Sequence, residues 1–382
     1  MEQFTLTLKV GEHDRENCPV WVKLDPALAK AGGLALTDQS GKSVPCQVLP
    51  GDPPKLCFVP AKLGRGESAT FTLATGPAPK VAGVELTDVP GERIDVRIAG
   101  AFFTSYHYAE KWVRPFLLPV IGAYGDPVTR QYPVVDVPGE QHDHHHHKSC
   151  WVAWGKVNGS DNWSEQPGHG RQIHRGFSVC EGGPVFGRLV SRNDWVNKDG
   201  AKVLEEVRTL TFYNLPATGR LLDLSVTFIA SEGPVEFGDT KEGGIASIRV
   251  ASSMDADKGG TIINAYGGIN EAETWGKRAH WCDYFGPVNG KTVGISIFDT
   301  PGNFRYPTYW HVRNYGLMTA NPFGLSHFWK DPARNGTHTI PKGAVFPFTY
   351  RLYFHAGDTH AACVAGKFHD HVAPPTVEIK PG

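Results

Sequence analysis

Apolar and polar residues alternate along much of this chain, at the two-residue period of a β-strand whose two faces meet different surroundings. The opening segment, residues 1–10 (MEQFTLTLKV), has this pattern. The same pattern, or a short apolar run of strand length, predicts further strands at 20–24, 44–49, 56–59, 69–73, 185–192, 209–213, 222–229, 293–298 and 348–354. No long stretch has helical periodicity, and no repeat has the period of a solenoid or propeller. The chain is therefore predicted to be all-β.

The spacing of the strands predicts two folding units. The first ninety residues carry short strands separated by glycine- and proline-containing turns, as in a small β-sandwich, and the whole sequence holds 44 glycines and 29 prolines. Residues 75–80 (TGPAPK) read as a connection. We expect a small β-sandwich accessory domain over 1–82. Residues 83–382 are expected to form a large antiparallel β super-sandwich, two stacked sheets with a ligand on one concave face.

Composition and charge limit which binding partners and which cellular compartment are expected for this protein. The formal net charge is −1, which gives no electrostatic support for binding nucleic acid. No apolar run approaches the roughly 18 residues that cross a bilayer. The seven cysteines are scattered, without CxxC spacing, and the N-terminal segment does not read as a leader, so we expect a cytoplasmic protein, or a periplasmic one if a leader has been removed. The expected ligand is a small molecule or oligosaccharide. No nucleotide cofactor is expected, because no GxGxxG or Walker A motif occurs.

The most distinctive segment is a run of four histidines, His144 to His147, between Asp143 and Lys148. Neutral imidazole is a good metal ligand and a good general base near neutral pH. If the run enters a strand, His144 and His146 share one face, which makes them the candidate catalytic bases or metal ligands. Asp143, His147 and Lys148 would then support them. An exposed histidine-rich loop is the alternative, but the apolar residues that follow favour a strand.

Two aromatic segments indicate a sugar site. Trp154 precedes an Asn158-Gly turn, and Trp163 follows it. Aromatic faces stack on pyranose rings, and amides bind hydroxyl groups, although tight turns and buried tryptophans explain the same residues. The segment 304–316 (FRYPTYWHVRNYG) is also rich in aromatic, cationic and amide side chains. A surface loop in which arginine stacks on aromatic rings is its alternative reading.

Each of these segments supplies candidate site residues. In 304–316, Trp310 is a stacking residue, His311 an acid, base or third metal ligand, and Arg313 and Asn314 bind oxygen atoms. A second pair, Lys241-Glu242, puts an amine and a carboxylate beside two glycines and adds two candidate catalytic groups. A charged hairpin tip explains that pair equally well.

The residues 143–151, with 157–159 and Trp163, resemble the signature of a bacterial family of unknown function, the 6807 family, once labelled methane oxygenase-like. Further matches are 114–116, 129–130, 241–243, 275–278, 307–316 and 321–323. The resemblance covers about 100–355, and the sequence departs from the pattern at His145, where proline is usual, and Cys150, where leucine is usual. It implies a β-sandwich of the galactose mutarotase-like type and a place among genes for sugar dehydrogenases, isomerases and 3-keto-glycoside lyases.

The leading hypothesis is a carbohydrate-active enzyme, a lyase or hydrolase acting on glycosides or oxidised (3-keto) sugars. In one form, a histidine removes the proton beside a 3-keto group while a cation or a divalent metal holds the enolate oxygen. The predicted roles are base or ligand for His144 and His146, acid or third ligand for His311, oxygen binding for Arg130 and Arg313, and ring stacking for Trp154 and Trp310.

Two alternatives belong to other classes of function. A non-catalytic sugar-binding β-sandwich needs only the tryptophans and amides. A metal-dependent oxygenase would use His144, His146 and a carboxylate such as Glu242 as a facial triad. The lyase scheme with a metal would instead use His144, His146 and His311 as ligands. The sequence leaves these choices open.

Overall fold

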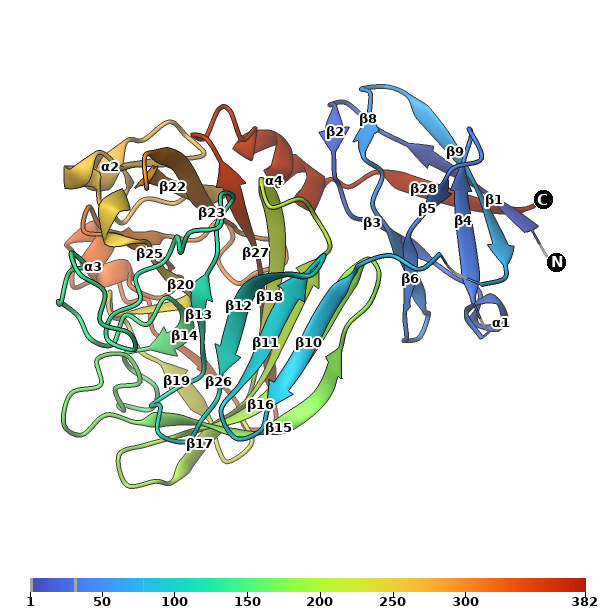
Figure 1. The fold of residues 1–382 in the computed structure, drawn as a ribbon. Helices are drawn as coiled ribbons and strands as arrows, with labels where there is room; N and C mark the ends of the chain where they lie inside the picture. Colours follow the sequence, from blue (N-terminus) through green and yellow to red (C-terminus); the bar gives the residue numbers. More distant parts are fainter. Residues whose placement is uncertain (1–2, 31–32, 78) are drawn as a thin grey trace.

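The computed structural model describes residues 3–30, 33–77 and 79–382, and it is an all-β protein with two units (Figure 1). Ala78, inside the predicted connection, and Met1 and Glu2, inside the predicted first strand, lie outside the described residues. The predicted strands are present with shifts of one to a few residues at their ends, and several are longer than expected. In the described part of the chain, no helix has the length and apolar character needed to cross a lipid bilayer.

The small unit packs a five-stranded sheet and a three-stranded sheet around a core of its own. The five-stranded sheet has the order β28-β1-β9-β4-β5, with β28 (Thr376–Pro381), β1 (Gln3–Lys9), β9 (Ser68–Thr75), β4 (Leu34–Asp38) and β5 (Ser43–Val44). The other elements are β3 (Val20–Lys23), β7 (Lys55–Phe58) and β6 (Cys46–Leu49), the pair β2 (Arg15–Glu16) and β8 (Lys62–Leu63), and α1 (Pro26–Ala29).

The C-terminal strand corrects the predicted domain boundary. Residues 83–382 were expected to form the large unit, but β28 leaves that unit and pairs antiparallel with β1 along its whole length (Figure 1). Val377 and Ile379 of β28 pack against the core of the small unit. The small unit is therefore discontinuous in sequence, and the large unit begins at β10 and ends with α4, before residue 376.

The large unit is a sandwich of two eight-stranded antiparallel sheets, as predicted. The first sheet runs β10 (Val84–Val89), β11 (Arg93–Ile98), β12 (Ala101–His107), β13 (Phe116–Val120), β14 (Cys150–Trp154), β20 (Gly243–Arg249), β25 (Leu317–Ala320) and β24 (Trp310–Val312). The second runs β15 (Arg171–Glu181), β16 (Phe186–Val196), β17 (Lys202–Tyr213), β18 (Gly219–Ile229), β27 (Val345–Ala356), β23 (Lys291–Phe298), β22 (Trp281–Val288) and β21 (Thr261–Asn264).

Short elements complete the large unit. They are the strand pair β19 (Val235–Phe237) and β26 (His338–Ile340), the 3₁₀ turns η1 (Ser252–Met254) and η2 (Ala256–Lys258), and the helices α2 (Asn270–Thr274), α3 (Leu325–Trp329) and α4 (Val364–Val372). The two units meet through an apolar cluster, in which Trp21 packs on Phe186 at 5.3 Å between ring centroids, and through polar contacts. Arg15 of β2 forms an ion pair with Asp370 of α4 at 3.1 Å, and the Gln47 side chain accepts from the backbone N–H groups of Val185 and Phe186.

The main core lies between the two eight-stranded sheets, and it decides which residues remain for a site. Along β14, Val152 and Trp154 belong to this core, whereas Trp151 and Ala153 point to the opposite face of the sheet. Each fully buried aliphatic or aromatic side chain contributes about 1.5–3 kcal/mol to folding. This outer face of the first sheet carries the polar residues described next.

Candidate active site

The outer face of the first sheet carries a row of side chains that crosses five strands. Antiparallel register places one residue from each strand opposite the next, in the order His311, Thr319, Ser247, Trp151 and Phe116. The neighbours of these residues along each strand point into the core, as expected from alternation. His311 therefore shares a face with Trp151, which lies under the histidine run. Strand spacing separates the two backbone positions by roughly 14 Å.

The histidine run is a turn and not a strand, which corrects the prediction. β14 begins only at Cys150, and His144 has a left-handed backbone with φ of 40°. The alternation that would place His144 with His146 is therefore absent. Instead His144 stacks on His147 at 4.8 Å between ring centroids, and His147 stacks on Trp151 at 5.2 Å. The turn exposes His144 and buries His146 and His147.

Asp143 connects this turn to two buried arginines. Its Oδ1 accepts from Arg249 Nη2 at 2.8 Å and also from Arg130 Nη1, while its Oδ2 lies 2.9 Å from Nδ1 of His144. Burial raises the pKa of Asp143, but the contact with His144 and the two guanidinium groups outweigh it and hold the pKa well below the usual range. Asp143 is thus an anion at neutral pH. It fixes Nδ1 of His144 as a donor, and the lone pair of the neutral ring lies on Nε2.

Arg130 acts as a support of the turn and not as an exposed ligand. Its side chain is fully covered, and its guanidinium donates to the carbonyl oxygens of Gln141, Asp143, His144 and His147. Burial and the neighbouring Arg249 lower its pKa to about 10, so it stays charged at neutral pH. The predicted direct contact of Arg130 with substrate is therefore not available in this arrangement.

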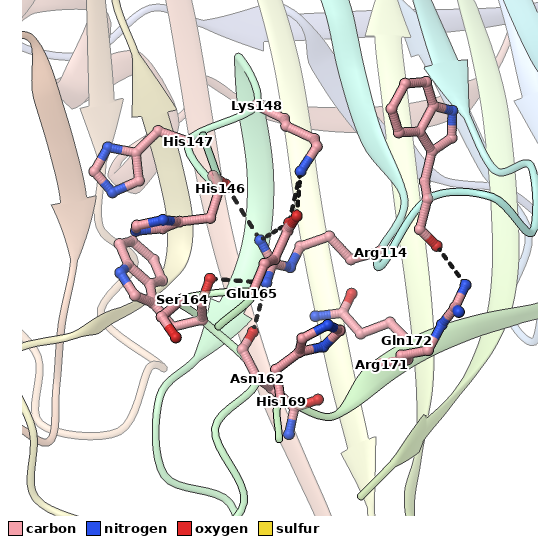
Figure 2. A network of polar contacts seen from close by, with 12 residues as sticks. Arg114, His146, His147, Lys148, Asn162, Ser164, Glu165, His169, Arg171 and Gln172 are labelled. Atoms are coloured by element: carbon pink, nitrogen blue, oxygen red, sulfur yellow. Dashed lines mark hydrogen bonds and ion pairs between the residues drawn. The ribbon is translucent and has the colours of Figure 1, made fainter. Parts of the chain in front are cut away.

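Lys148 also points inward, to a buried ion cluster with Glu165 and Arg114. Figure 2 shows Glu165 between the two cations, with its Oε1 2.7 Å from Lys148 Nζ and 2.9 Å from Arg114 Nη1. Arg114 further donates to the carbonyl oxygens of His146 and Trp163. Burial lowers the pKa of Lys148 to about 8, with Glu165 opposing the shift. The cluster joins the histidine turn to the loop after β14, and Lys148 is covered by it.

His311 is buried on the edge strand β24, and its protonation is set by a neighbour. The Trp275 indole N–H can only donate, and it donates to His311 Nδ1 at 2.8 Å. Nδ1 is therefore an acceptor, and the ring hydrogen lies on Nε2. Burial, with the nearby cations Lys241 and Arg313, lowers the pKa of His311 to about 3. His311 is thus a neutral hydrogen-bond donor at physiological pH, and in this state it is not a base.

Charged pairs and one phenol lie near this face. Lys241 pairs with Glu242 at 2.7 Å, and Arg313 pairs with Glu271 at 2.8 Å, each with partly exposed side chains. Tyr315 stacks on His144 at 4.9 Å and lies under the guanidinium groups of Arg249 and Arg313. Burial raises the pKa of Tyr315 to about 12, so the phenol keeps its proton. Asn314 is tied to Glu271 through backbone and side-chain hydrogen bonds.

Three residues that were predicted to bind substrate do not take part in this site. Trp154 and Trp310 are fully buried between the sheets, where their indole N–H groups donate to the carbonyl oxygens of Gly238 and Ala279, so neither can stack on a ligand. Asn158 is a left-handed residue of an exposed turn, and its side chain bonds to the backbone of Pro234 and of Glu236 in β19. These predictions are wrong for two reasons. Trp154 and Trp310 lie on the faces of their strands that point into the core, and the side chain of Asn158 is taken up by these hydrogen bonds to the backbone.

The predicted metal ligands do not meet. In residues 3–30, 33–77 and 79–382, no group of three His, Cys, Asp or Glu side chains is arranged to hold a metal ion. His146 is buried in the turn, where its Nδ1 has no partner in the described part of the chain, and burial lowers its pKa to about 2. The structure therefore does not assemble His144, His146 and His311 as one ligand set, and His146 is not placed with Glu242 as a facial triad.

Sequence reasoning missed three residues that organise the site. Arg249 interrupts the apolar strand 245–250 on the same parity as Ser247, a signal that one face of this strand is polar. Trp275 was considered only as part of the family match at 275–278, although its indole sets the protonation of His311. Glu165 follows Trp163 in a loop, and nothing local in the sequence indicates that it pairs with Lys148.

The comparisons with known proteins identify the family. The model of a family of unknown function, DUF6807, matches residues 93–369, and the chain belongs to this family. A search of curated proteins finds no match. Among solved structures, the chain is similar to an alpha-mannosidase from Enterococcus faecalis V583 at 9% identity and a TM-score of 0.43. The match covers 99% of this chain and 46% of that one, so this chain spans about half the length of the mannosidase.

Proposed function

We propose that this member of the DUF6807 family is a carbohydrate-active enzyme that removes a proton from its substrate, with His144 as the general base. One observation carries the proposal: Asp143 holds Nδ1 of a partly exposed His144, which leaves the Nε2 lone pair free. A carboxylate that fixes the tautomer and orientation of an imidazole is a recurrent arrangement in acid–base catalysis. Here two buried arginines hold the carboxylate in turn.

The second histidine supports a division of roles. His144 presents an acceptor, whereas the neutral His311 presents its Nε2 hydrogen. A base paired with a neutral histidine that donates to a carbonyl oxygen suits enolisation, because the base removes the proton beside the carbonyl while the donor stabilises the enolate oxygen. Arg313 and Lys241 add positive charge near His311. Of the reactions expected from the sequence, β-elimination from an oxidised glycoside uses both features.

This elimination needs no reactant other than the 3-keto-glycoside. His144 Nε2 takes the C2 proton of a 3-keto-glycoside, and the C–H electrons form the C2=C3 enolate. The enolate then returns its electrons to reform the C3 carbonyl, the C1=C2 double bond forms, and the C1–O bond breaks. The leaving alkoxide takes a proton from the His144 imidazolium. The products are an enone and an alcohol, and the enzyme returns to its starting state.

The proposed site also contains two aromatic side chains on which a sugar ring can stack. Trp275 and Tyr315 are partly exposed, and each contacts one of the two histidines. Trp275 is fixed by its hydrogen bond to His311, and Tyr315 by stacking and by two arginines. Fixed aromatic rings beside hydrogen-bonding groups are typical of sites that bind amphipathic ligands such as sugars. These two residues take the role expected of Trp154 and Trp310.

The test follows the enone absorbance on incubation with 3-keto-glucosides, once with EDTA and once with added divalent metal. We expect turnover by the wild type and a loss of about 10²–10⁴-fold in kcat/KM for His144→Ala. The matched control is His145→Ala, the next residue in the turn, whose side chain forms no hydrogen bond with Asp143 in the described structure; its kcat/KM should stay within about threefold of the wild type.

Three outcomes would contradict the proposal. A His144→Ala enzyme as active as the wild type removes the proposed base. No turnover of any 3-keto-glycoside, with p-nitrophenyl glycosides cleaved instead, would replace the lyase by a hydrolase; no turnover of either class, with sugar binding retained, would leave a sugar-binding module.

A further inference from the structure

A cavity beside β15 contains neither His144 nor His311, although Arg114 of the ion cluster under the histidine turn is part of its lining. It has a volume of about 360 Å³ and lies between the chain segments that join β12 to β13 and the start of β15, the edge strand of the second sheet. Its lining includes Tyr108, Trp112, Arg171 and His174, together with the charged residues Glu110, Arg114 and Arg175. The volume falls within the range of roughly 300–1,000 Å³ that is usual for small-molecule sites.

His174 has a fixed tautomer because of a buried polar chain. Its Nδ1 lies 2.9 Å from Ser191 Oγ, and Ser191 in turn donates to Asn193 Oδ1 at 3.1 Å and accepts from the Tyr106 hydroxyl at 3.2 Å. Since the serine hydrogen is already used, Nδ1 of His174 must donate to Ser191. The ring lone pair is then on Nε2, which has no partner in the described part of the chain.

This polar chain is unusual for its position. Tyr106, Ser191 and Asn193 are almost fully buried between the two sheets, where apolar side chains would pack without any need for hydrogen bonds. The chain leads out of the core through His174. Burial lowers the pKa of His174, so the ring is neutral at pH 7 and its Nε2 is an acceptor. A ligand that meets it must offer a donor such as a hydroxyl group.

Arg171 supplies a fixed positive charge. Its Nη2 donates to the carbonyl oxygens of Glu110 and Trp112, and its remaining N–H groups have no partner in the described residues. No carboxylate of the described chain pairs with it, whereas the neighbouring Arg175 is neutralised by Asp194 at 2.6 Å. A guanidinium with two free donors in a fixed plane is suited to a carboxylate.

Tyr108 provides a rigid aromatic face. Its hydroxyl donates to Asp88 at 2.7 Å and accepts from the Gly91 N–H, so the ring cannot swing away. His174 packs against this ring at 4.7 Å between centroids. Trp112 is partly exposed and packs edge-on against Phe116. An aromatic face, an acceptor for a hydroxyl group and a donor to a carboxylate thus line one partly open cavity.

We propose that this cavity is a second binding site, for a small ring compound that carries both hydroxyl groups and a carboxylate, a sugar acid of one pyranose ring being the simplest case. The carboxylate pairs with Arg171, a ring hydroxyl donates to His174 Nε2, and the ring lies against Tyr108. This site does not depend on the proposed function, because it shares no residue with the pair His144 and His311.

The experiment measures binding of sodium D-glucuronate and D-glucose by saturation-transfer NMR and calorimetry. We expect glucuronate to bind at least tenfold more tightly than glucose, since a charge-assisted contact outweighs a neutral one. Arg171→Met should lower the affinity for glucuronate to the affinity for glucose. His174→Phe keeps the ring packing but removes the acceptor, and should weaken both ligands about five- to tenfold.

Controls separate this site from others and from misfolding. Arg192→Met, an exposed arginine on the neighbouring strand that pairs with Glu205, should bind as the wild type does. His144→Ala should also retain glucuronate binding, which keeps failure of the active-site proposal distinct from failure of this one. Each variant is first checked by thermal unfolding. The proposal is overturned if glucuronate shows no saturable binding up to about 50 mM, or if Arg171→Met and His174→Phe both bind it normally.

Discussion

His144 has a backbone conformation that a side chain other than glycine rarely adopts. Its φ of 40° lies in the left-handed region, which costs a residue of this kind about 1 kcal/mol or more. The turn holds this conformation because Arg130 binds the carbonyl oxygen of His144 and Asp143 binds its ring. Strain of this type is tolerated where surrounding contacts over-determine it, and here the result is an exposed imidazole with one nitrogen fixed and one free.

Glu165 is the residue whose loss should most disturb the support of this turn. It is the carboxylate of a cluster in which Lys148 and Arg114 are both buried. Glu165→Gln leaves two cations facing each other away from water, and breaking a buried ion pair from one side costs about 3–5 kcal/mol. We expect a loss of that size in the free energy of unfolding, measured by urea denaturation at pH 7.

A surface pair provides the comparison. Glu378 pairs with Lys9 at 3.1 Å, and both side chains are more than half exposed. Glu378→Gln should therefore change the free energy of unfolding by less than about 1 kcal/mol. If Glu165→Gln cost no more than this, the cluster would not be a support of the turn, and its contacts with His146 and Trp163 through Arg114 would have to be explained otherwise.

At this scale, the sequence identified the right kinds of residue but not their positions. The histidine run, Arg130 and Lys148 were expected to lie together, and in the structure Arg130 binds the turn that contains the histidines and Lys148 follows it directly. Which of them are exposed depends on contacts with Glu165 and Arg249, which are distant in sequence. Trp154 was assigned to the site, although Trp151 is the tryptophan on the outer face. The alternation of side chains shows that the two residues point to opposite faces of the strand, but it does not show which face packs against the second sheet.

Strands themselves were well predicted, because a two-residue period is a local signal. Residues 222–229 and 293–298 fall inside β18 and β23. Their partners were not predictable in the same way: β18 pairs with β27, more than a hundred residues later, and β24 and β25 pair with each other at one end of the first sheet. The histidine run was misassigned for a related reason, since the apolar residues after it belong to β14 and the run itself is the turn that enters it.

The C-terminal strand offers a test at the level of one element. β28 is the outer neighbour of β1 and adds Val377 and Ile379 to the core of the small unit. Removing residues 376–382 should expose β1 as an edge and lower the stability of the small unit by about 2–4 kcal/mol, from two lost apolar side chains and a strand of hydrogen bonds. Calorimetry should show an early transition for the small unit, with the main transition of the large unit unchanged.

The same strand supplies the control. Lys380 is exposed, and Lys380→Gln should leave both transitions within about 0.5 kcal/mol of the wild type. A truncated chain with the unfolding profile of the full one would mean that β28 is not needed by the small unit. Loss of both transitions together would mean that the two units unfold as one, through contacts such as Arg15 with Asp370.

For the whole molecule, buried histidines set how stability depends on pH. Burial lowers the pKa of His146 to about 2, of His311 to about 3 and of His371 to about 4, against about 6.5 in an unfolded chain. Below pH 6.5 these histidines therefore take up protons in the unfolded chain, whereas in the folded protein they stay neutral until the pH reaches their lowered pKa. Each such histidine contributes stability that is fully present above pH 6.5 and falls by about 1.4 kcal/mol per pH unit as the pH drops to its folded pKa.

Two carboxyl groups act in the opposite direction. Burial raises the pKa of Asp255 and of Asp299 to about 6, so the folded protein takes up their protons before the unfolded chain does, and stability from these groups rises as pH falls from 6 towards 4. His147 and His174, whose pKa values burial also lowers, add to the contribution of the histidines. The histidines outnumber the carboxyls, so the net free energy of unfolding should fall between pH 6.5 and 4.5.

His371 allows one of these contributions to be isolated. It lies in α4, away from both proposed sites, with Nε2 2.8 Å from the Thr300 hydroxyl. His371→Gln removes the titrating group while keeping a side chain that can bond to Thr300, so its free energy of unfolding should fall less steeply than that of the wild type, by about 1 kcal/mol per pH unit between pH 6 and 4.5. Urea denaturation at several pH values measures both slopes, and the exposed His360, changed to Gln, should keep the wild-type slope. Parallel curves for wild type and His371→Gln would show that His371 takes up a proton in the folded protein as readily as in the unfolded chain, which contradicts the burial argument for this residue.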